Sequence, residues 1–371
     1  MDMARSCHFA YFMRYGLKAR ERTGAGFDAP QIGTFVHDVM EHTLRQAKEC
    51  GGLHTLSKEK LHALVRASIE EYIDRVLPDL CEKSARFRYL FNRLCATVER
   101  IMDEVSEELQ SSDFEPLAFE LKFCADGQLP AITIREENGT ARVVGKVDRV
   151  DGWLHDGKLY LRVVDYKTGK KSFDLAELRY GLGLQMLLYL FTLKEEGQML
   201  FGGHEIVPAG VLYTPAREPM LRCARDTEPE KIEKALKKEL RRSGMVLEDP
   251  AVLQAMEHSA LESPCYLPIA VKRDGAVTGS LASAEQLGKL SKYVDHILHE
   301  ITQEVFAGNI DADPYARTPQ QSACTYCEFA SACHFENGCG SDRMEYIKAT
   351  KNDEFWQYID EVNGEGAHEN G

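Results

Sequence analysis

The pattern of apolar and polar positions gives this chain a helical first third. Residues 1–23 combine aromatic and basic residues and favour a short helix, followed by a turn over Gly24–Pro30. Residues 31–49 form the next predicted helix. Its apolar residues recur at helical spacing: Ile32, Phe35, Val36, Val39, Met40 and Leu44. Residues 57–111 carry many charges and few helix breakers, which predicts a helical insertion or subdomain.

From about residue 117 the pattern changes to the alternation of strands. The runs 117–124, 141–152 and 159–169 contain β-branched residues and alternate in polarity, with turn signals at Asn138-Gly139 and Asp156-Gly157. They predict an antiparallel meander. The later predictions are a long helix over 174–197, a strand at 206–216, helical segments at 228–260 and 283–307, and a disordered acidic end at 363–371.

Composition places limits on the class of protein. The 371 residues contain no run near the ~20 apolar residues that span a bilayer, and no signal peptide begins the sequence, so we expect a soluble cytoplasmic protein. The net charge of −14 argues mildly against a uniformly basic DNA-binding face. It does not exclude a nuclease, which needs carboxylates at its metal site. The basic run 231–242 is interpreted as a solvated helix face, with DNA or partner contact as the alternative.

Eleven cysteines are the most unusual compositional feature. Cys7 stands alone near the start, whereas Cys324, Cys327 and Cys333 form a C-x2-C-x5-C cluster near the end. Thiolates at such spacings hold a soft metal or an iron–sulfur cluster, and Cys7 would supply the fourth ligand. Cys339 is the competitor for a ligand place. The remaining cysteines are expected to be core residues or surface thiols: Cys50, Cys81, Cys95, Cys124, Cys223 and Cys265.

Acidic residues and one lysine gather near the ends of two predicted strands. Asp165 and Lys167 are two residues apart, so both side chains project from one face of a strand, and Asp148 lies beside them if the two strands pair. Carboxylates suit a hard cation such as Mg²⁺, which polarises a phosphodiester and activates water. Lys167 would orient the nucleophile or offset charge in the transition state. The alternative is a hairpin with ordinary surface charges.

Four further residues are candidates for the same site. Glu120 is an acid flanked by apolar residues on an earlier strand, and His37 lies among apolar neighbours on a helix. Gln185 and Tyr189 share a helix face. The alternatives are a satisfied core histidine for His37 and helix packing for Tyr189. The sequence has neither the spacing of a zinc-protease motif around His37 nor a phosphate-binding P-loop.

These motifs resemble the RecB-type branch of the PD-(D/E)xK nucleases. The matching segments are VVGKVDRVD, VVDYKTG and GLQMLLYL. The resemblance implies a Mg²⁺ (or Mn²⁺) site held by His37, Asp148 and Asp165. It also implies a catalytic set of Asp148, Asp165, Lys167, Gln185 and Tyr189, to which we add Glu120.

The flanking segments CHFAYFMRYGLKARER, DAPQIGTFVH and CTYCEFASACHFE resemble the C-terminal nuclease domain of the AddB family. That family belongs to the AddAB helicase–nuclease, which processes double-strand breaks. The resemblance spans roughly 5–335. It implies a [4Fe–4S] cluster on Cys7, Cys324, Cys327 and Cys333, DNA with a single-stranded end as substrate, and an AddA-type partner subunit. The 371 residues contain no counterpart of that family's helicase-like region, so they do not predict helicase-linked processivity.

The predicted fold is a mixed α/β restriction-endonuclease-like core. It has a central mixed sheet flanked by helices, a helical insertion, and an iron–sulfur clip joining the terminal segments. The predicted divisions are an N-terminal segment 1–30, a helical region 31–116, a nuclease core 117–310, a cluster segment 311–340 and a tail 341–371. The predicted function is a Mg²⁺-dependent DNA exonuclease. The alternatives are a CRISPR-associated RecB-like exonuclease and a non-catalytic DNA-binding module with structural zinc.

Overall fold

The computed structural model describes residues 1–20, 29–340 and 342–364. The turn expected over Gly24–Pro30 and the disorder expected at 363–371 therefore lie almost wholly outside the described residues. None of the helices in those ranges is long and apolar enough to cross a membrane.

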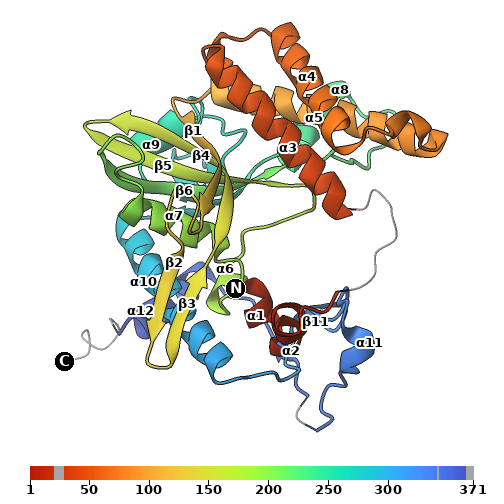
Figure 1. Cartoon of the computed structure of the whole chain (residues 1–371). Helices are drawn as coiled ribbons and strands as arrows, with labels where there is room; N and C mark the ends of the chain where they lie inside the picture. The colour runs from red at the N-terminus through yellow and green to blue at the C-terminus, as the bar shows by residue number, and fades with distance from the viewer. Residues whose placement is uncertain (21–28, 341, 365–371) are drawn as a thin grey trace.

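Residues 29–110 form a helical lobe, drawn in red and orange at the top of Figure 1. Its long helices are α3 (Ala29–Glu49), α4 (Lys58–Val76) and α5 (Ala85–Gln110), with 3₁₀ turns at Leu53–Thr55 and Leu80–Glu82. Ser57 and Ser84 cap α4 and α5 by accepting a backbone N–H, which satisfies one of the free donors at each helix start. The predicted apolar face of α3 is buried, with Phe35 and Val39 fully inaccessible.

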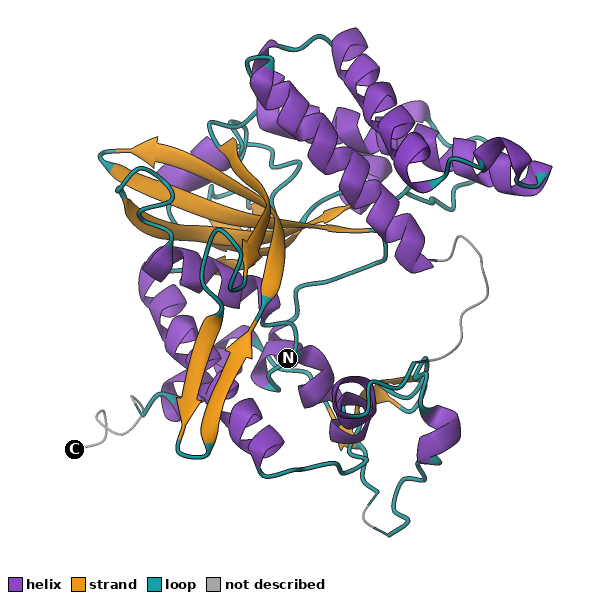
Figure 2. Ribbon diagram, viewed as in Figure 1, coloured by secondary structure: helices purple, strands orange, loops and turns teal. Residues whose placement is uncertain are grey.

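A six-stranded mixed sheet forms the centre of the molecule, in the order β1-β4-β5-β6-β7-β10. The strands are β1 (Glu115–Phe123), β4 (Gly145–His155), β5 (Lys158–Lys167), β6 (Glu205–Pro215), β7 (Ser243–Leu247) and β10 (Leu281–Ala282). Strands β1, β4 and β5 pair antiparallel, as the meander predicted, while β5 and β6 are parallel. Helices flank the sheet (Figure 2), so the predicted mixed α/β fold class is confirmed.

Several helices follow β5 in the chain, among them α6 (Leu175–Arg179), α7 (Gln185–Glu196), α8 (Pro229–Glu239), α9 (Pro250–Met256), α10 (Ala284–Phe306) and α12 (Asn352–Val362). Of these, α7, α9 and α10 contact the central sheet. Helix α7 lies against β5 and β6, and α10 packs on α7 and α12 (Figure 1). A separate ribbon of β2 (Ile132–Glu136) and β3 (Gly139–Val143) contacts α10 through Glu136 and His299, whose Oε1 and Nδ1 atoms are 2.5 Å apart.

Three sequence predictions about the elements between residues 139 and 260 are wrong in detail. The strand expected over 141–152 is divided at Val144 between β3 and β4. The long helix expected over 174–197 is broken into α6 and α7, because Gly181 and Gly183 adopt φ values of 74° and 71° that end a helix. The helical segment expected over 228–260 contains strand β7, which pairs with β6 and is too short to show its own period.

The two terminal regions of the chain lie side by side (Figure 1). The predicted N-terminal helix is interrupted at Cys7, whose extended backbone separates α1 (Asp2–Ser6) from α2 (His8–Tyr11), and a π-helical turn follows at Phe12–Gly16. The C-terminal elements beside them are β11 (Tyr315–Thr318), β12 (Gln321–Ser322), α11 (Ala330–Cys333) and β13 (Glu345–Tyr346), while β8 (Ile269–Val271) and β9 (Val277–Gly279) form a small hairpin elsewhere. Phe9 N–H donates to the carbonyl of Asp311 at 2.9 Å.

A buried network of charges joins the helical lobe to the sheet. Arg149 on β4 and Arg162 on β5 are fully inaccessible, and both contact Asp151, with Arg162 Nε 2.8 Å from its Oδ2 atom. Glu108 of α5 completes the network, and Arg242 Nη2 lies 2.6 Å from its Oε2 atom. Buried charges persist when they are paired and hydrogen-bonded in this way, so the network fixes α5 against β4, β5 and the start of β7.

Candidate active site

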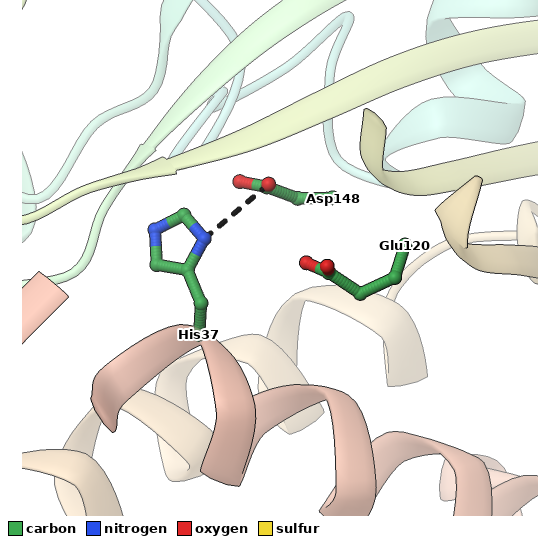
Figure 3. Close-up of side chains that lie close together, drawn as sticks. All are labelled: His37, Glu120 and Asp148. Atoms are coloured by element: carbon green, nitrogen blue, oxygen red, sulfur yellow. Dashed lines mark ion pairs between the residues drawn. The ribbon is translucent and has the colours of Figure 1, made fainter. Parts of the chain in front are cut away.

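His37 projects from α3 toward the ends of β4 and β5. Its Nε2 atom lies 2.9 Å from the carbonyl oxygen of Tyr166. Because a carbonyl only accepts, Nε2 carries the hydrogen, and Nδ1 is directed at Asp148 Oδ1, 3.3 Å away (Figure 3). Burial lowers the pKa of His37, but the hydrogen bond and charge of Asp148 outweigh it and raise that pKa overall. A histidine whose other nitrogen is fixed by a carbonyl is well oriented as a metal ligand.

Glu120 faces the same space from strand β1. The register pairs Phe119 with Arg149 and Leu121 with Val147, so Glu120 lies opposite Asp148. Its φ of 50° is rare for a residue with a side chain and re-aims the carboxylate at this point. One ligand atom each from His37, Glu120 and Asp148 lies within 4.8 Å of the others (Figure 3). Burial raises the pKa of Glu120, although its ion pair with Lys146 opposes the shift.

Asp165 and Lys167 occupy one face of β5, as the sequence predicted. Lys167 Nζ lies 2.6 Å from Asp165 Oδ2 and 5.8 Å from the centre of the Tyr213 ring. Burial and the nearby charge of Asp148 raise the pKa of Asp165, and the Lys167 ammonium partly offsets them. The pair therefore sits directly beside the group formed by His37, Glu120 and Asp148.

Tyr166 organises the site in a way that the sequence analysis missed. Its backbone N–H donates to Asp148 Oδ2 at 2.8 Å, and its carbonyl accepts from His37. Its phenol oxygen points to the opposite side and accepts from Arg149 Nη1 at 2.7 Å. The sequence shows a tyrosine between two charged residues of a buried strand. It does not show the contacts of the Tyr166 backbone, because every residue type has the same peptide groups.

The sequence predicts His37, Asp148 and Asp165 as metal ligands, and this ligand set stays a prediction. Glu120 joins His37 and Asp148, whereas Asp165 is held by Lys167 beside them. Two other acids near the site are already engaged by arginines. Asp38 Oδ2 is 2.6 Å from Arg75 Nη2, and Glu41 Oε1 is 2.7 Å from Arg45 Nη2. His37, Glu120 and these two acids border a cavity of about 310 Å³ that reaches Lys146 and Gly33.

Gln185 and Tyr189 lie just behind this group. Gln185 Nε2 donates to the Tyr189 hydroxyl at 2.8 Å, and that hydroxyl accepts from the backbone N–H of Lys146 at 3.3 Å. Tyr189 is buried and stacks on Phe123 with ring centres 5.1 Å apart. A Cβ at Gly145 would lie 2.0 Å from the Tyr189 hydroxyl oxygen, so only glycine admits this approach. Both residues therefore support the start of β4 from a position outside the metal-binding group.

The four cysteines predicted as cluster ligands meet in a second place. Cys7, Cys324, Cys327 and Cys333 all line one cavity of about 150 Å³, whereas Cys339 is exposed and outside its lining. Burial raises the pKa of Cys7 to about 11. Burial and the neighbouring thiols also raise the pKa of Cys324. Four thiols around one enclosed space are a donor set that fits a metal cluster, and binding would deprotonate them.

Two contacts hold the N-terminal thiol beside the others. The backbone N–H of His8 donates to Asp313 Oδ1 at 3.0 Å, and His8 Nδ1 lies 2.6 Å from Asp313 Oδ2. Arg14 forms an ion pair with Glu328, which lies between the cysteines of the C-terminal segment. The sequence analysis did not find these contacts, because their partners are about 300 residues apart.

A mixed sheet that presents three carboxylates and a lysine at adjoining strands, facing a histidine from a helix, is the arrangement of a metal-dependent nuclease. The family profile of the PD-(D/E)XK nuclease superfamily matches residues 2–334, and the chain belongs to that superfamily. Membership implies a divalent metal, and the group of His37, Glu120 and Asp148 fits one.

Similarity to individual proteins places the chain more narrowly within this superfamily. The chain is 31% identical over 366 residues to the B subunit of the ATP-dependent helicase/deoxyribonuclease of Thermoanaerobacter sp. (strain X514), a match that covers 97% of this chain and 32% of that protein. Proteins of the same name match from Ruminiclostridium cellulolyticum (31% over 361 residues; 96% and 31% covered) and Caldanaerobacter subterraneus subsp. tengcongensis (32% over 371 residues; 99% and 32% covered). The resemblance to the AddB family is thus confirmed, and the chain spans about a third of the length of these curated relatives.

Proposed function

We propose that this chain is a Mg²⁺-dependent DNA exonuclease of the AddB type. The observation that carries the proposal is the convergence of His37, Glu120 and Asp148 within 4.8 Å, next to the Asp165–Lys167 pair. The relatives are named as deoxyribonucleases, which supports DNA as the substrate. Mn²⁺ would substitute for Mg²⁺, because both prefer oxygen ligands.

The proposed roles follow from the contacts of each residue. His37, Glu120 and Asp148 would hold the divalent cation, with Asp165 beside them. When bound, the cation polarises the phosphodiester and lowers the pKa of a bound water. Lys167 would place its ammonium beside the phosphoryl oxygens and offset their growing negative charge. Gln185 and Tyr189 would act as positioning residues, since the Tyr189 hydroxyl contacts the backbone two residues from Asp148 and Gln185 donates to that hydroxyl.

Cleavage assays on single strands with either end labelled would test this function. We expect shortened products with Mg²⁺ or Mn²⁺ and none with EDTA, and a circular single strand should resist, because an exonuclease needs an end. Cutting of the circle would identify an endonuclease instead. Retained cleavage by folded Asp165→Ala or Lys167→Ala protein would refute the assignment of the site.

We also propose that Cys7, Cys324, Cys327 and Cys333 hold a [4Fe–4S] cluster. Their shared cavity supports this. Anaerobic purification should give a brown protein with broad visible absorption and bound iron. A colourless protein containing zinc would contradict the proposal.

The name of the relatives supports an AddA-type helicase–nuclease subunit as the partner. A CRISPR-associated exonuclease is the weaker alternative, because the similarity to these helicase/deoxyribonuclease proteins extends over nearly the whole chain. Co-purification of the chain with the helicase subunit of the same genome would test the partner. Cleavage that depends on ATP when the chain and the helicase subunit are both present, but not when the chain is alone, would support the assembly.

A further inference from the structure

A second cavity has Lys167 in its lining, the lysine that pairs with Asp165 beside the candidate metal site. It has a volume of about 330 Å³. Its charged lining residues are Lys167, Lys170, Lys171, Arg217, Arg241 and Glu239. Five positive groups and one negative group give a local formal charge of +4, in a chain whose net charge is −14. Such a local reversal of sign concentrates anions at one place on the surface.

The central sheet brings these residues together from three segments that are far apart in the sequence. Lys170 and Lys171 lie on the loop that follows β5. Arg217 follows β6, while Glu239 ends α8 and Arg241 precedes β7. The loop is pinned at both ends, since the Lys167 carbonyl accepts from Ala216 N–H at 2.9 Å and Phe173 N–H donates to Ser243 Oγ at 2.7 Å.

Glu239 occupies the place where these positive groups converge. Its Oε1 atom lies 3.0 Å from Lys170 Nζ and 2.8 Å from Arg217 Nη2. A single carboxylate oxygen thus receives two cations, while the buried Nε of Arg217 has no hydrogen-bond partner within the described structure. A backbone phosphodiester carries its negative charge on two non-bridging oxygens and is a strong ligand for lysine and arginine.

We propose that this cavity binds a backbone phosphate of the DNA strand adjacent to the phosphodiester at the metal site, and that Glu239 competes with that phosphate for Lys170 and Arg217. The proposal rests on the nuclease function proposed above and adds a named subsite to it. The aromatic lining residue, Tyr213, is buried beneath Lys167 and offers no face for base stacking. We therefore expect the cavity to contact the DNA backbone and not to discriminate between base sequences.

Removal of one positive group should weaken DNA binding. Lys170→Gln is the safest change, because 79% of that side chain is exposed and folding does not depend on it. Binding of a short fluorescein-labelled single strand of mixed sequence, measured by anisotropy in EDTA, should fall. The slope of log affinity against log salt concentration should become shallower by about 0.7, which is the value for one lost phosphate contact on a single strand. Arg217→Gln should act in the same direction. Lys231→Gln is the matched control, since it removes an exposed lysine paired with Glu228 outside the cavity.

Removal of the competitor should have the opposite effect. Glu239→Gln should bind the same strand more tightly than the unaltered chain, because Lys170 and Arg217 are released for the phosphate. The control is Glu233→Gln on the same helix, which removes an equal charge paired with Lys237 at 3.0 Å and lies outside the cavity. A general gain from reduced negative charge would appear in both variants, whereas competition appears in Glu239→Gln alone.

The outcomes separate this subsite from the proposed function. If Lys170→Gln matches Lys231→Gln, or Glu239→Gln matches Glu233→Gln, the subsite is refuted even when the chain cleaves DNA with Mg²⁺. Undetectable binding of the strand by the unaltered chain would also refute it. If the binding changes occur as expected but no divalent metal supports cleavage, the subsite stands and the proposed nuclease function fails.

Discussion

Asp148 is oriented from two sides before any metal is bound. Its Oδ2 atom accepts from Tyr166 N–H, while Oδ1 faces the Nδ1 atom of His37. Each carboxylate oxygen thus has a defined neighbour, and the side chain has little freedom left to lose. Sites whose ligands are held in this way bind a metal without first ordering their own residues.

We therefore expect Asp148→Asn to abolish cleavage while the protein stays folded. The loss of metal affinity should exceed the roughly 10- to 100-fold that removal of an outer-shell partner costs. Titration calorimetry with Mn²⁺ would measure the affinity, and circular dichroism the fold. Asp156→Asn is the matched control, because Asp156 is 89% exposed in the turn between β4 and β5. Equal metal affinity in the two variants would contradict the ligand role.

Glu120 offers a test of stored strain. Its φ of 50° costs an ordinary side chain about 1–2 kcal/mol, a cost that glycine escapes. Glu120→Gly should therefore be more stable than Glu120→Ala by about 1 kcal/mol. Both variants should bind Mn²⁺ more weakly. At Lys122, two residues further along β1, the order should reverse, since alanine suits an ordinary strand position better than glycine. Urea denaturation of the four variants would measure the differences.

The sequence indicated the residues of the candidate site better than their roles. Asp148, Asp165 and Lys167 were found because alternation along a strand fixes which side chains share a face. Glu120 and His37 were named as candidates for one site, but the way in which Glu120 faces His37 depends on a positive φ within β1 and on a strand register across the sheet, which the sequence does not show. The contribution of Tyr166 was also hidden, since it acts through peptide groups that every residue possesses.

Helix α5 is joined to the sheet by Glu108. Burial alone would raise the pKa of Glu108, but the charges of Arg242, Arg162 and Arg149 outweigh it and lower the pKa to about 2 from an ordinary 4.5. A depressed pKa means that the stabilisation is fully present above pH 4.5 and is lost as the pH falls toward 2.

Replacing this carboxylate should therefore loosen α5 from the sheet. Glu108→Gln should lower the free energy of unfolding by about 3–5 kcal/mol at neutral pH, because it leaves buried arginines without a counter-charge. Between pH 4.5 and 2, the stability of the variant should also fall less than that of the unaltered chain. Chemical denaturation across this pH range would measure both effects. Glu107→Gln, on the exposed side of the same helix, should change neither.

The accuracy of the element predictions followed the length of each pattern. Helix α3 and helix α10 repeat their apolar positions over many turns, so both were predicted closely. Strand β7 has five residues between two helices and is covered by its neighbours, so no period distinguished it. The break between α6 and α7 depends on two glycines with positive φ. Glycine can adopt this conformation, but its presence in the sequence does not show that it does.

At the scale of the whole molecule, the four cysteines should act as one unit. Cys7→Ser should lose the cluster iron, and Cys339→Ser should retain it. Loss of a cross-link that closes a loop of this length should lower stability by up to about 5 kcal/mol in the chain-entropy model. Iron analysis and limited proteolysis would check this, with early cleavage near the N-terminal segment expected in Cys7→Ser. Full iron in Cys7→Ser, or its loss in Cys339→Ser, would overturn the ligand assignment.

The contact between the first residues and the last third of the chain also affects when the N-terminal segment can pack during synthesis. His8 and its partner Asp313 are separated by 305 positions. At a synthesis rate of roughly 5–20 residues per second, the N-terminal segment waits about 15 to 60 s before its partner leaves the ribosome. During that interval Phe9 and the other apolar residues packed around Cys7 have no surface to cover them. We therefore expect the newly made segment to need protection, such as binding by a chaperone, until Asp313 has been synthesised.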